Sequence, residues 1–229
     1  MEYAIISAGE GSRLANEGVK TPKPLVKLGG TTLLERLMNI FQRNGASSIS
    51  VIINNENEEV KNYVGRLKLD VPFRLVIKST PSSMHSFYEL SRYLHSDKFC
   101  LTTVDTVFRE TEFSQYIRAF AESDEIDGLM AVTSFIDDEK PLYVECADNG
   151  IISSFDDVDT GRCQYVSGGI YCLRSTVFAA LERAINENQS RMRNFQRRLL
   201  AEGFSLKAFP FSKIIDIDHA SDIVKAEEL

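Results

Sequence analysis

A chain of 229 residues, 43% of them hydrophobic, can bury one sizeable core or two small ones. Its net charge of −7 and pI near 5.1 argue against a nucleic-acid partner, which would be bound mainly through Lys and Arg that neutralise phosphates. No apolar run approaches the ~20 residues of a membrane-spanning helix and no signal peptide is recognisable, so we expect a cytoplasmic protein without a membrane partner. The cysteines lack CxxC spacing, and we expect them to be reduced structural thiols.

The first half of the chain alternates short apolar runs with amphipathic segments, the pattern of βα units around a largely parallel sheet. Thr32 followed by Glu35 predicts a capping box at the start of a helix. Strands are predicted at residues 3–6, 49–53, 73–77 and 99–103, and helices after Thr32, near 56–68 and from about 85 to 95.

Beyond Gly128 the pattern changes, because Asp148-Asn149-Gly150 is a strong hairpin turn signal between apolar segments 142–146 and 151–155. An inserted antiparallel hairpin is therefore predicted there. The remaining predictions are a strand at 169–173, helices near 175–188 and 190–202, a strand at 214–217 and a final helix. Without a repeat or linker, residues 1–229 are expected to form one domain.

The segment that leaves the first strand carries the clearest chemical signal. Glycines directly after a strand let backbone N–H groups approach an anion, and triphosphate oxygens are natural ligands for such a loop. Arg13 and Lys23 can add two positive charges, with Lys23 restricted by a proline on either side. The dinucleotide fingerprint would need a glycine at Leu14, and a P-loop would need Gly-Lys-Ser/Thr, so neither is present. The candidate nucleotide-binding residues in this loop are Ala8, Gly9, Gly11 and Ser12.

The loop Gly9-Glu10-Gly11-Ser12-Arg13-Leu14, joined to Pro22-Lys23-Pro24-Leu25, resembles the signature of the NTP-transferase superfamily, which includes sugar-1-phosphate nucleotidyltransferases and bacterial phosphocholine cytidylyltransferases. Three later segments, Leu101 to Asp105, Ser167 to Tyr171, and Asp216-Ile217-Asp218 with Asp222, resemble further motifs of that superfamily in the expected order.

This resemblance implies an α/β fold with a doubly wound, mostly parallel sheet, Rossmann-like and glycosyltransferase-A-like. It also implies Mg²⁺ as cofactor, catalytic roles for Arg13 and Lys23, nucleotide and metal contacts for Asp105, and substrate contacts for Gly168, Gly169 and Tyr171.

The acidic residues leave one question open. Asp105 follows an apolar strand and is expected at the carboxyl edge of the sheet, where open α/β sheets bind ligands. Asp216 and Asp218 alternate along a predicted strand, so only one of them is expected to face the same side as Asp105. Either can complete a Mg²⁺ site, which commonly uses one or two carboxylates; the other is expected to cap the last helix beside Ser221.

The function predicted from these features is Mg²⁺-dependent transfer of a nucleoside monophosphate from an NTP to a small phosphorylated acceptor, foremost a sugar 1-phosphate, giving an NDP-sugar and pyrophosphate. Alternatives are a phosphocholine-type acceptor, a molybdopterin guanylyltransferase, and a non-catalytic regulatory domain that binds nucleotide. The base, the acceptor and a homo-oligomeric state stay open.

Two segments bear on these alternatives. Residues 79–86 lack the Gly-rich base-reading turn that sugar-nucleotide members of the superfamily usually carry and that phosphocholine cytidylyltransferases also lack. Ser82 and Ser83 either contact a base or cap the next helix. A phosphocholine site would need an aromatic cage, for which the candidate rings are Tyr88, Tyr143, Tyr165 and Tyr171. The arginines of residues 190–198 are interpreted as a solvated helix face or as ligands of the acceptor phosphate.

Overall fold

The computed structural model describes residues 1–9 and 11–229, so Glu10 of the predicted loop lies outside the described residues. The helices are α1 Ser12–Asn16, α2 Leu33–Arg43, α3 Glu58–Val64, α4 Ser83–Ser91, α5 Glu110–Glu122, α6 Phe178–Asn186, α7 Met192–Ala201 and α8 Ala220–Glu227, with short 3-10 turns η1 Lys23–Leu25 and η2 Ser175–Val177. The strands are β1 Glu2–Ser7, β2 Lys27–Leu28, β3 Thr31–Thr32, β4 Ser48–Ile53, β5 Phe73–Ile77, β6 Lys98–Thr103, β7 Thr106–Phe108, β8 Gly128–Thr133, β9 Tyr143–Cys146, β10 Ile152–Asp156, β11 Tyr165–Arg174, β12 Leu206–Phe211 and β13 Ile214–Asp216.

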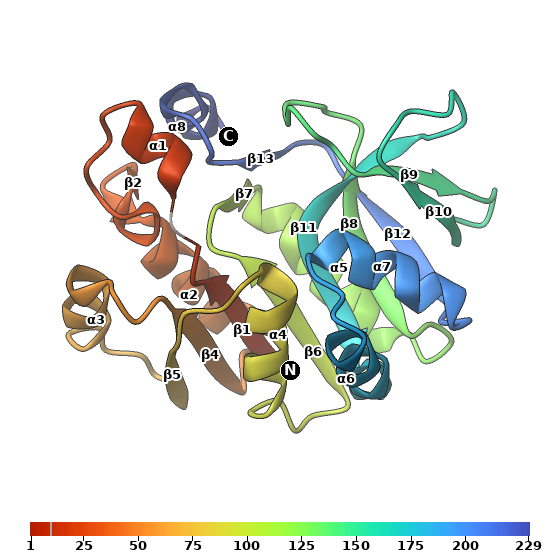
Figure 1. The fold of residues 1–229 in the computed structure, drawn as a ribbon, viewed down its shortest axis with the longest axis horizontal. Coiled ribbons are helices and arrows are strands. Elements are labelled where there is room, and N and C mark those ends of the chain that lie inside the picture. The colour runs from red at the N-terminus through yellow and green to blue at the C-terminus, as the bar shows by residue number, and fades with distance from the viewer. Residues whose placement is uncertain (10) are drawn as a thin grey trace.

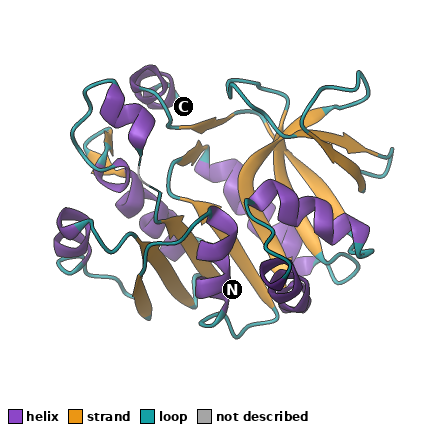
Figure 2. Ribbon diagram, in the orientation of Figure 1, coloured by secondary structure: helices purple, strands orange, loops and turns teal. Residues whose placement is uncertain are grey.

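Helices cover both faces of a central sheet (Figures 1 and 2). Within the described ranges, nine strands form this sheet, in the order β10-β9-β11-β6-β1-β4-β5, with β8 also paired to β11 and β12 paired to β8. β1 pairs in parallel with β4 and β6, and β4 pairs in parallel with β5, whereas β11 runs antiparallel to its neighbours. The predicted doubly wound, mostly parallel α/β fold is confirmed, with antiparallel pairing at β11 and between β9 and β10.

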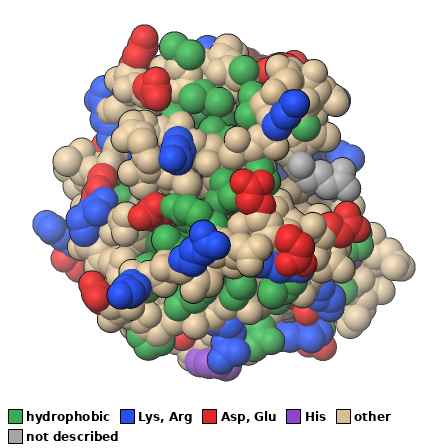
Figure 3. Space-filling view, turned by 90° about the vertical axis from the view of Figure 1, so that its left-hand side faces the viewer, with side chains coloured by type: hydrophobic (Ala, Val, Ile, Leu, Met, Phe, Trp, Pro, Cys, Tyr) green, Lys and Arg blue, Asp and Glu red, His purple; other side chains and the backbone are tan. Residues whose placement is uncertain are grey.

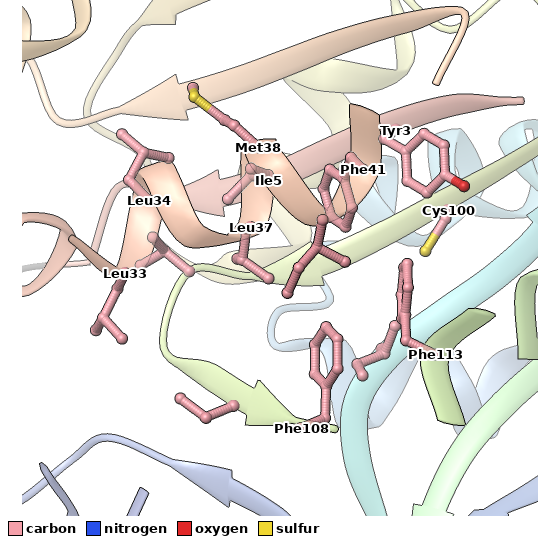
Figure 4. Packing of buried hydrophobic residues seen from close by; sticks show 14 of the residues in the cluster. Tyr3, Ile5, Leu33, Leu34, Leu37, Met38, Phe41, Cys100, Phe108 and Phe113 are labelled. Atoms are coloured by element: carbon pink, nitrogen blue, oxygen red, sulfur yellow. The ribbon is translucent and has the colours of Figure 1, made fainter. Parts of the chain in front are cut away.

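The side chains of β1 explain why the sheet is covered on both faces. Tyr3 and Ile5 join one buried cluster together with α2 and α5, whereas Ala4 and Ile6 join a second cluster with α4, α6 and α7. In the first cluster the Tyr3 ring stacks on Phe41 at a centroid distance of 4.5 Å, and Phe41 stacks on Phe113 at 5.7 Å (Figure 4). A strand that is apolar on both faces needs a helix layer on each side.

The predicted hairpin is confirmed, since β9 and β10 pair antiparallel around Gly150, whose φ is +78°. Helix α3 is shorter than expected, and α4 begins at Ser83 rather than near residue 85. The longest elements that were not predicted from the sequence are α5, β8 and β12; the short elements α1, β2, β3 and β7 were not predicted either. β8 is a fully buried apolar run without alternation, and β12 carries Pro210, which is tolerated because β12 is an edge strand paired with β8.

The predicted capping box at α2 is half right. Thr32 is the N-cap, and its hydroxyl accepts a hydrogen bond from the Glu35 backbone N–H at 3.2 Å. The Glu35 carboxylate, however, accepts from the Tyr63 hydroxyl. This side chain therefore ties α2 to α3 rather than closing the box.

No helix in the described part of the chain is both long and apolar enough to cross a membrane. On the face drawn in Figure 3, Lys and Arg side chains are interspersed with Asp and Glu. The four cysteines are free thiols, and Cys100 and Cys172 are buried.

Candidate active site

The loop after β1 opens onto a cavity of about 510 Å³, here called the glycine-loop cavity. Most of the predicted nucleotide and metal residues share its lining, which includes Ala8, Gly9, Gly11, Ser12, Lys23, Ser82, Ser83 and Asp105. Arg13 lies on α1 outside this lining and reaches the C-terminal segment instead. The predicted loop and the predicted metal aspartate therefore lie on the same side of the sheet.

Gly11 fixes the position of Lys23. Its φ of +63° belongs to the left-handed region, and a Cβ at this position would lie 3.2 Å from the Lys23 Cβ. A side chain here would be strained and would also press against the Lys23 Cβ. The glycine is thus needed both for the turn and for the close approach of the cation.

Two cations and two carboxylates meet at the mouth of the loop. The Lys23 ammonium lies 2.7 Å from a carboxylate oxygen of Asp105 and 2.7 Å from one of Asp218. The Arg13 guanidinium contacts the other oxygen of Asp218 at 2.5 Å. Burial acts to raise the pKa of Asp105, but the Lys23 charge and its hydrogen bond outweigh burial and lower that pKa below its usual range. Asp105 is therefore ionised at neutral pH.

Asp216 lies beside this network and carries a buried oxygen, Oδ1, with no hydrogen-bond partner among residues 1–9 and 11–229. Burial, and next the negative charge of Asp105, raise the pKa of Asp216 to about 8. A buried carboxylate with an unused oxygen, next to a second carboxylate, fits a divalent cation. No group of three His, Cys, Asp or Glu side chains with metal-binding spacing occurs in the described ranges, but Mg²⁺ commonly needs one or two carboxylates beside phosphate oxygens.

The expectation that only one of Asp216 and Asp218 faces Asp105 is wrong. β13 ends at Asp216, so the alternation of a strand does not extend to Asp218. The Asp218 N–H donates to the Asp216 carbonyl at 3.0 Å, and the Ile217 N–H donates to the Asp105 carbonyl at 3.1 Å. This tight turn carries both carboxylates to the Asp105 side.

The expected cap of the last helix is also wrong. His219 is the N-cap of α8, and Asp222 completes the capping box by accepting from the backbone N–H of His219 at 2.7 Å and of Asp218 at 3.1 Å. Neither Asp216 nor Asp218 therefore caps α8, and Asp222 holds the turn that presents them.

A second cavity of about 320 Å³, here called the β11 cavity, shares Ser83, Thr103 and Asp105 with the first. Its other lining residues include Gly169, Tyr171, Ser167, Gln196, Arg191, Arg193 and Asp216. Gly168 lines a smaller adjoining pocket with Asp216 and Asp218. Asp105 thus stands at the boundary between two cavities, one beside the glycine loop and one beside the predicted substrate strand.

Sequence reasoning missed several polar side chains around these carboxylates. The hydroxyls of Thr103 and Thr106 lie 2.7 Å apart, and a Cβ on Gly169, whose φ is +73°, would come within 3.4 Å of both. Ser167 donates to the Gln196 side-chain oxygen at 3.1 Å inside the β11 cavity. Only the position of Thr103 next to the end of β6 signalled a site; Thr106 and Gln196 become visible only in the fold.

The four candidate tyrosines do not form one cage. Of these, Tyr171 lines the β11 cavity, Tyr143 lines a separate surface cavity, and the Tyr88 ring lies under the Arg92 guanidinium at 5.1 Å. Tyr165 packs at the edge of the second buried cluster. The arginines of α7 include Arg193, whose guanidinium contacts Asp157 at 2.6 Å and also lines the β11 cavity.

Residues 3–203 match the family of the MobA-like NTP transferase domain. The chain belongs to this family. Over 234 aligned residues, the chain is 22% identical to a bifunctional IPC transferase and DIPP synthase from Archaeoglobus fulgidus, covering 99% of this chain and 43% of that protein. It is 35% identical over 70 residues to the bifunctional protein GlmU from Buchnera aphidicola, covering 31% of this chain and 14% of that protein. The chain thus spans less than half the length of these curated relatives.

Solved structures match the chain over almost its whole length. An inositol-1-phosphate CTP transferase from T. maritima superposes with a TM-score of 0.83 at 20% identity, covering 99% of this chain and 94% of that one. A putative glucose-1-phosphate thymidylyltransferase from Bacillus anthracis superposes with a TM-score of 0.84 at 18% identity, covering 100% and 94%. At these identities the likeness establishes the fold alone.

Proposed function

We propose that this chain transfers a nucleoside monophosphate from an NTP to a small polyhydroxylated 1-phosphate, such as a sugar 1-phosphate, and releases pyrophosphate. The observation that carries the proposal is the position of Asp105 between the glycine-loop cavity and the β11 cavity, with Lys23 in contact with its carboxylate. A triphosphate in the first cavity and an acceptor in the second would meet at this point. We further propose that residues 1–229 act as one nucleotidyltransferase domain, since β1 and the C-terminal segment both contribute to the site.

The reaction needs no protein nucleophile. An oxygen of the acceptor phosphate bonds to the α-phosphorus of the NTP, the bond from that phosphorus to the oxygen bridging the β-phosphate breaks, and pyrophosphate leaves with that oxygen. The loop N–H groups, Lys23 and Arg13 would bind the triphosphate and balance its charge, so catalysis rests on positioning and preorganised electrostatics. Lys23 would exchange its contacts with Asp105 and Asp218 for phosphate oxygens.

Of the two carboxylates that this exchange releases, Asp105 lies beside Asp216 in the lining of the β11 cavity. Asp105 and Asp216 would hold Mg²⁺, because one is ionised and the other has a buried unused oxygen. Bound Mg²⁺ would supply positive charge against the triphosphate and orient the two reactants. Asp218, held by Arg13 and Lys23, would position those cations before the nucleotide binds.

The lining of the β11 cavity supports a hydroxyl-rich acceptor. Ser167, Gln196 and Thr103 offer neutral hydrogen-bonding groups, which suit ring hydroxyls. A quaternary ammonium would need converging aromatic rings, and of the four candidate tyrosines only Tyr171 lines this cavity. The curated and solved relatives named for inositol 1-phosphate and glucose 1-phosphate point the same way.

A screen of four NTPs against glucose 1-phosphate, inositol 1-phosphate, phosphocholine and molybdopterin, scored by pyrophosphate release with Mg²⁺ or EDTA and accompanied by a nucleotide-binding assay, tests the proposal. We expect release with one NTP and one polyol phosphate, only with Mg²⁺. Asp105→Asn should abolish release, whereas Asp70→Asn, the same change at an exposed position outside both cavities, should not. Nucleotide binding without release for any acceptor would instead indicate a regulatory domain, and release confined to GTP with a pterin acceptor would indicate a molybdopterin guanylyltransferase.

A further inference from the structure

Two serines of the glycine-loop cavity make hydrogen bonds that neither sequence alternative anticipated. The Ser82 hydroxyl accepts from the Arg191 backbone N–H at 3.2 Å, and the Ser83 hydroxyl accepts from the Met192 backbone N–H at 3.4 Å. Ser82 occupies the N-cap position of its own helix, α4, but makes no side-chain capping bond there. The two hydroxyls therefore join the start of α4 to the start of α7.

The start of α7 needs such partners. The first N–H groups of a helix have no acceptor within the helix, and α7 has no side-chain cap at Arg191. Arg191 also has a φ of +70° and a ψ of 138°, a conformation that residues other than glycine rarely adopt. A backbone of this kind persists only where surrounding contacts impose it. The Ser82 and Ser83 hydroxyls are two such contacts.

The segment held in this way forms one wall of the β11 cavity. Arg191, Met192 and Arg193 all line that cavity, and Gln196 one turn later binds Ser167 on β11. Ser82 and Ser83 line the glycine-loop cavity on the other side of the contact. One pair of side chains thus connects the wall of the proposed nucleotide site with the wall of the proposed acceptor site.

We propose that Ser82 and Ser83 are positioning residues that hold the first turn of α7. In this way the two serines, which border the proposed nucleotide site, also fix the wall of the proposed acceptor site. This inference rests on the proposed function for its assignment of the two cavities. It gives both serines a role besides the expected contact with the base, because their hydroxyls accept hydrogen bonds from α7. His85 Nδ1, 2.9 Å from the Ser82 hydroxyl, further fixes that group.

Steady-state kinetics of the double variant Ser82→Ala/Ser83→Ala test this role. We expect the KM for the acceptor found in the screen to rise about tenfold, the loss expected for two neutral hydrogen bonds, with the KM for the NTP nearly unchanged. Ser82→Thr/Ser83→Thr, which keeps both hydroxyls, should restore the acceptor KM. Ser91→Ala is the matched control, because this hydroxyl on α4 donates to the Tyr88 carbonyl of its own helix. A raised NTP KM with an unchanged acceptor KM would overturn the inference.

A second measurement is independent of turnover. Backbone amide exchange at Arg191 and Met192 should quicken in the double alanine variant and stay slow in the double threonine variant. Arg191→Gly should melt higher than Arg191→Ala, because glycine adopts φ +70° without strain, and this gap should shrink when both serines are alanine. The inference that the two serines hold α7 would be overturned by unchanged amide exchange in the double alanine variant. It would also be overturned by equal melting temperatures for the two Arg191 variants. Absence of pyrophosphate release by the unaltered protein would instead count against the proposed function. The amide-exchange data would still show whether Ser82 and Ser83 hold the first turn of α7.

Discussion

Replacing Lys23 by methionine removes the ammonium group that contacts both Asp105 and Asp218, while keeping a side chain of similar length. The Lys23, Asp105 and Asp218 side chains are 12%, 20% and 31% exposed, so most of their hydration is already lost. Breaking a fully buried pair costs about 3–5 kcal/mol, and with this partial exposure we expect about 2–3 kcal/mol without metal. For a chain of this size that corresponds to a loss of about 4–12 °C in Tm.

The destabilisation should grow as the pH rises from 5 to 8, because the carboxylates left without a cation can take up a proton at low pH and cannot do so at high pH. Added Mg²⁺ should recover part of the lost Tm if Asp105 and Asp216 hold it. Turnover should fall on the order of 10²-fold or more, the effect of losing a preorganised electrostatic donor.

Differential scanning fluorimetry in EDTA and in Mg²⁺, with pyrophosphate release as the activity assay, measures these effects. Lys27→Met is the control, since Lys27 is exposed on β2 and lines neither cavity. If Lys23→Met kept a Tm and a turnover close to those of Lys27→Met, the assignment of Lys23 as the central cation of the site would be refuted.

The remaining predictions concern separate parts of the molecule. Gly169→Ala should destabilise the fold more than Gly161→Ala, because both positions have positive φ but only the first would press a Cβ against the Thr106 hydroxyl at 3.1 Å; equal loss of Tm would contradict the crowding. In EDTA, stability should fall as the pH rises from about 4 to 8, because folded Asp216 keeps a proton that the unfolded chain releases near pH 4. Asp216→Asn should flatten this part of the plot of Tm against pH. Parallel plots for the variant and the unaltered protein would count against the raised pKa of Asp216. Thr32→Ala removes the α2 cap and should lower the free energy of unfolding, measured by urea titration, by about 0.5–2 kcal/mol. The KM for NTP should not change. A changed KM would indicate that the cap also shapes the site.

The glycine loop could be predicted from sequence because its chemistry is local. Each signal can be recognised within a few residues of chain: a glycine after a strand, a lysine between two prolines, and an aspartate at a strand end. Since the carboxyl ends of parallel strands share one edge of a sheet, the convergence of Gly11, Lys23 and Asp105 follows from the order of the elements. The strands of the first half were predictable for the same reason, as their apolar runs are short and bounded by clear turns.

The partners of individual side chains were decided by the tertiary structure alone. The tight turn after β13 brings Asp216 and Asp218 to one side, whereas strand periodicity separated them. The Ser82 hydroxyl meets a backbone N–H 109 residues away, a contact that no local pattern encodes. Residues close in sequence constrain one another through backbone geometry, so motifs reveal which chemistry a chain carries. Contacts between distant segments depend on how whole elements pack, and they determine which of those groups face a cavity and which hold the fold in place.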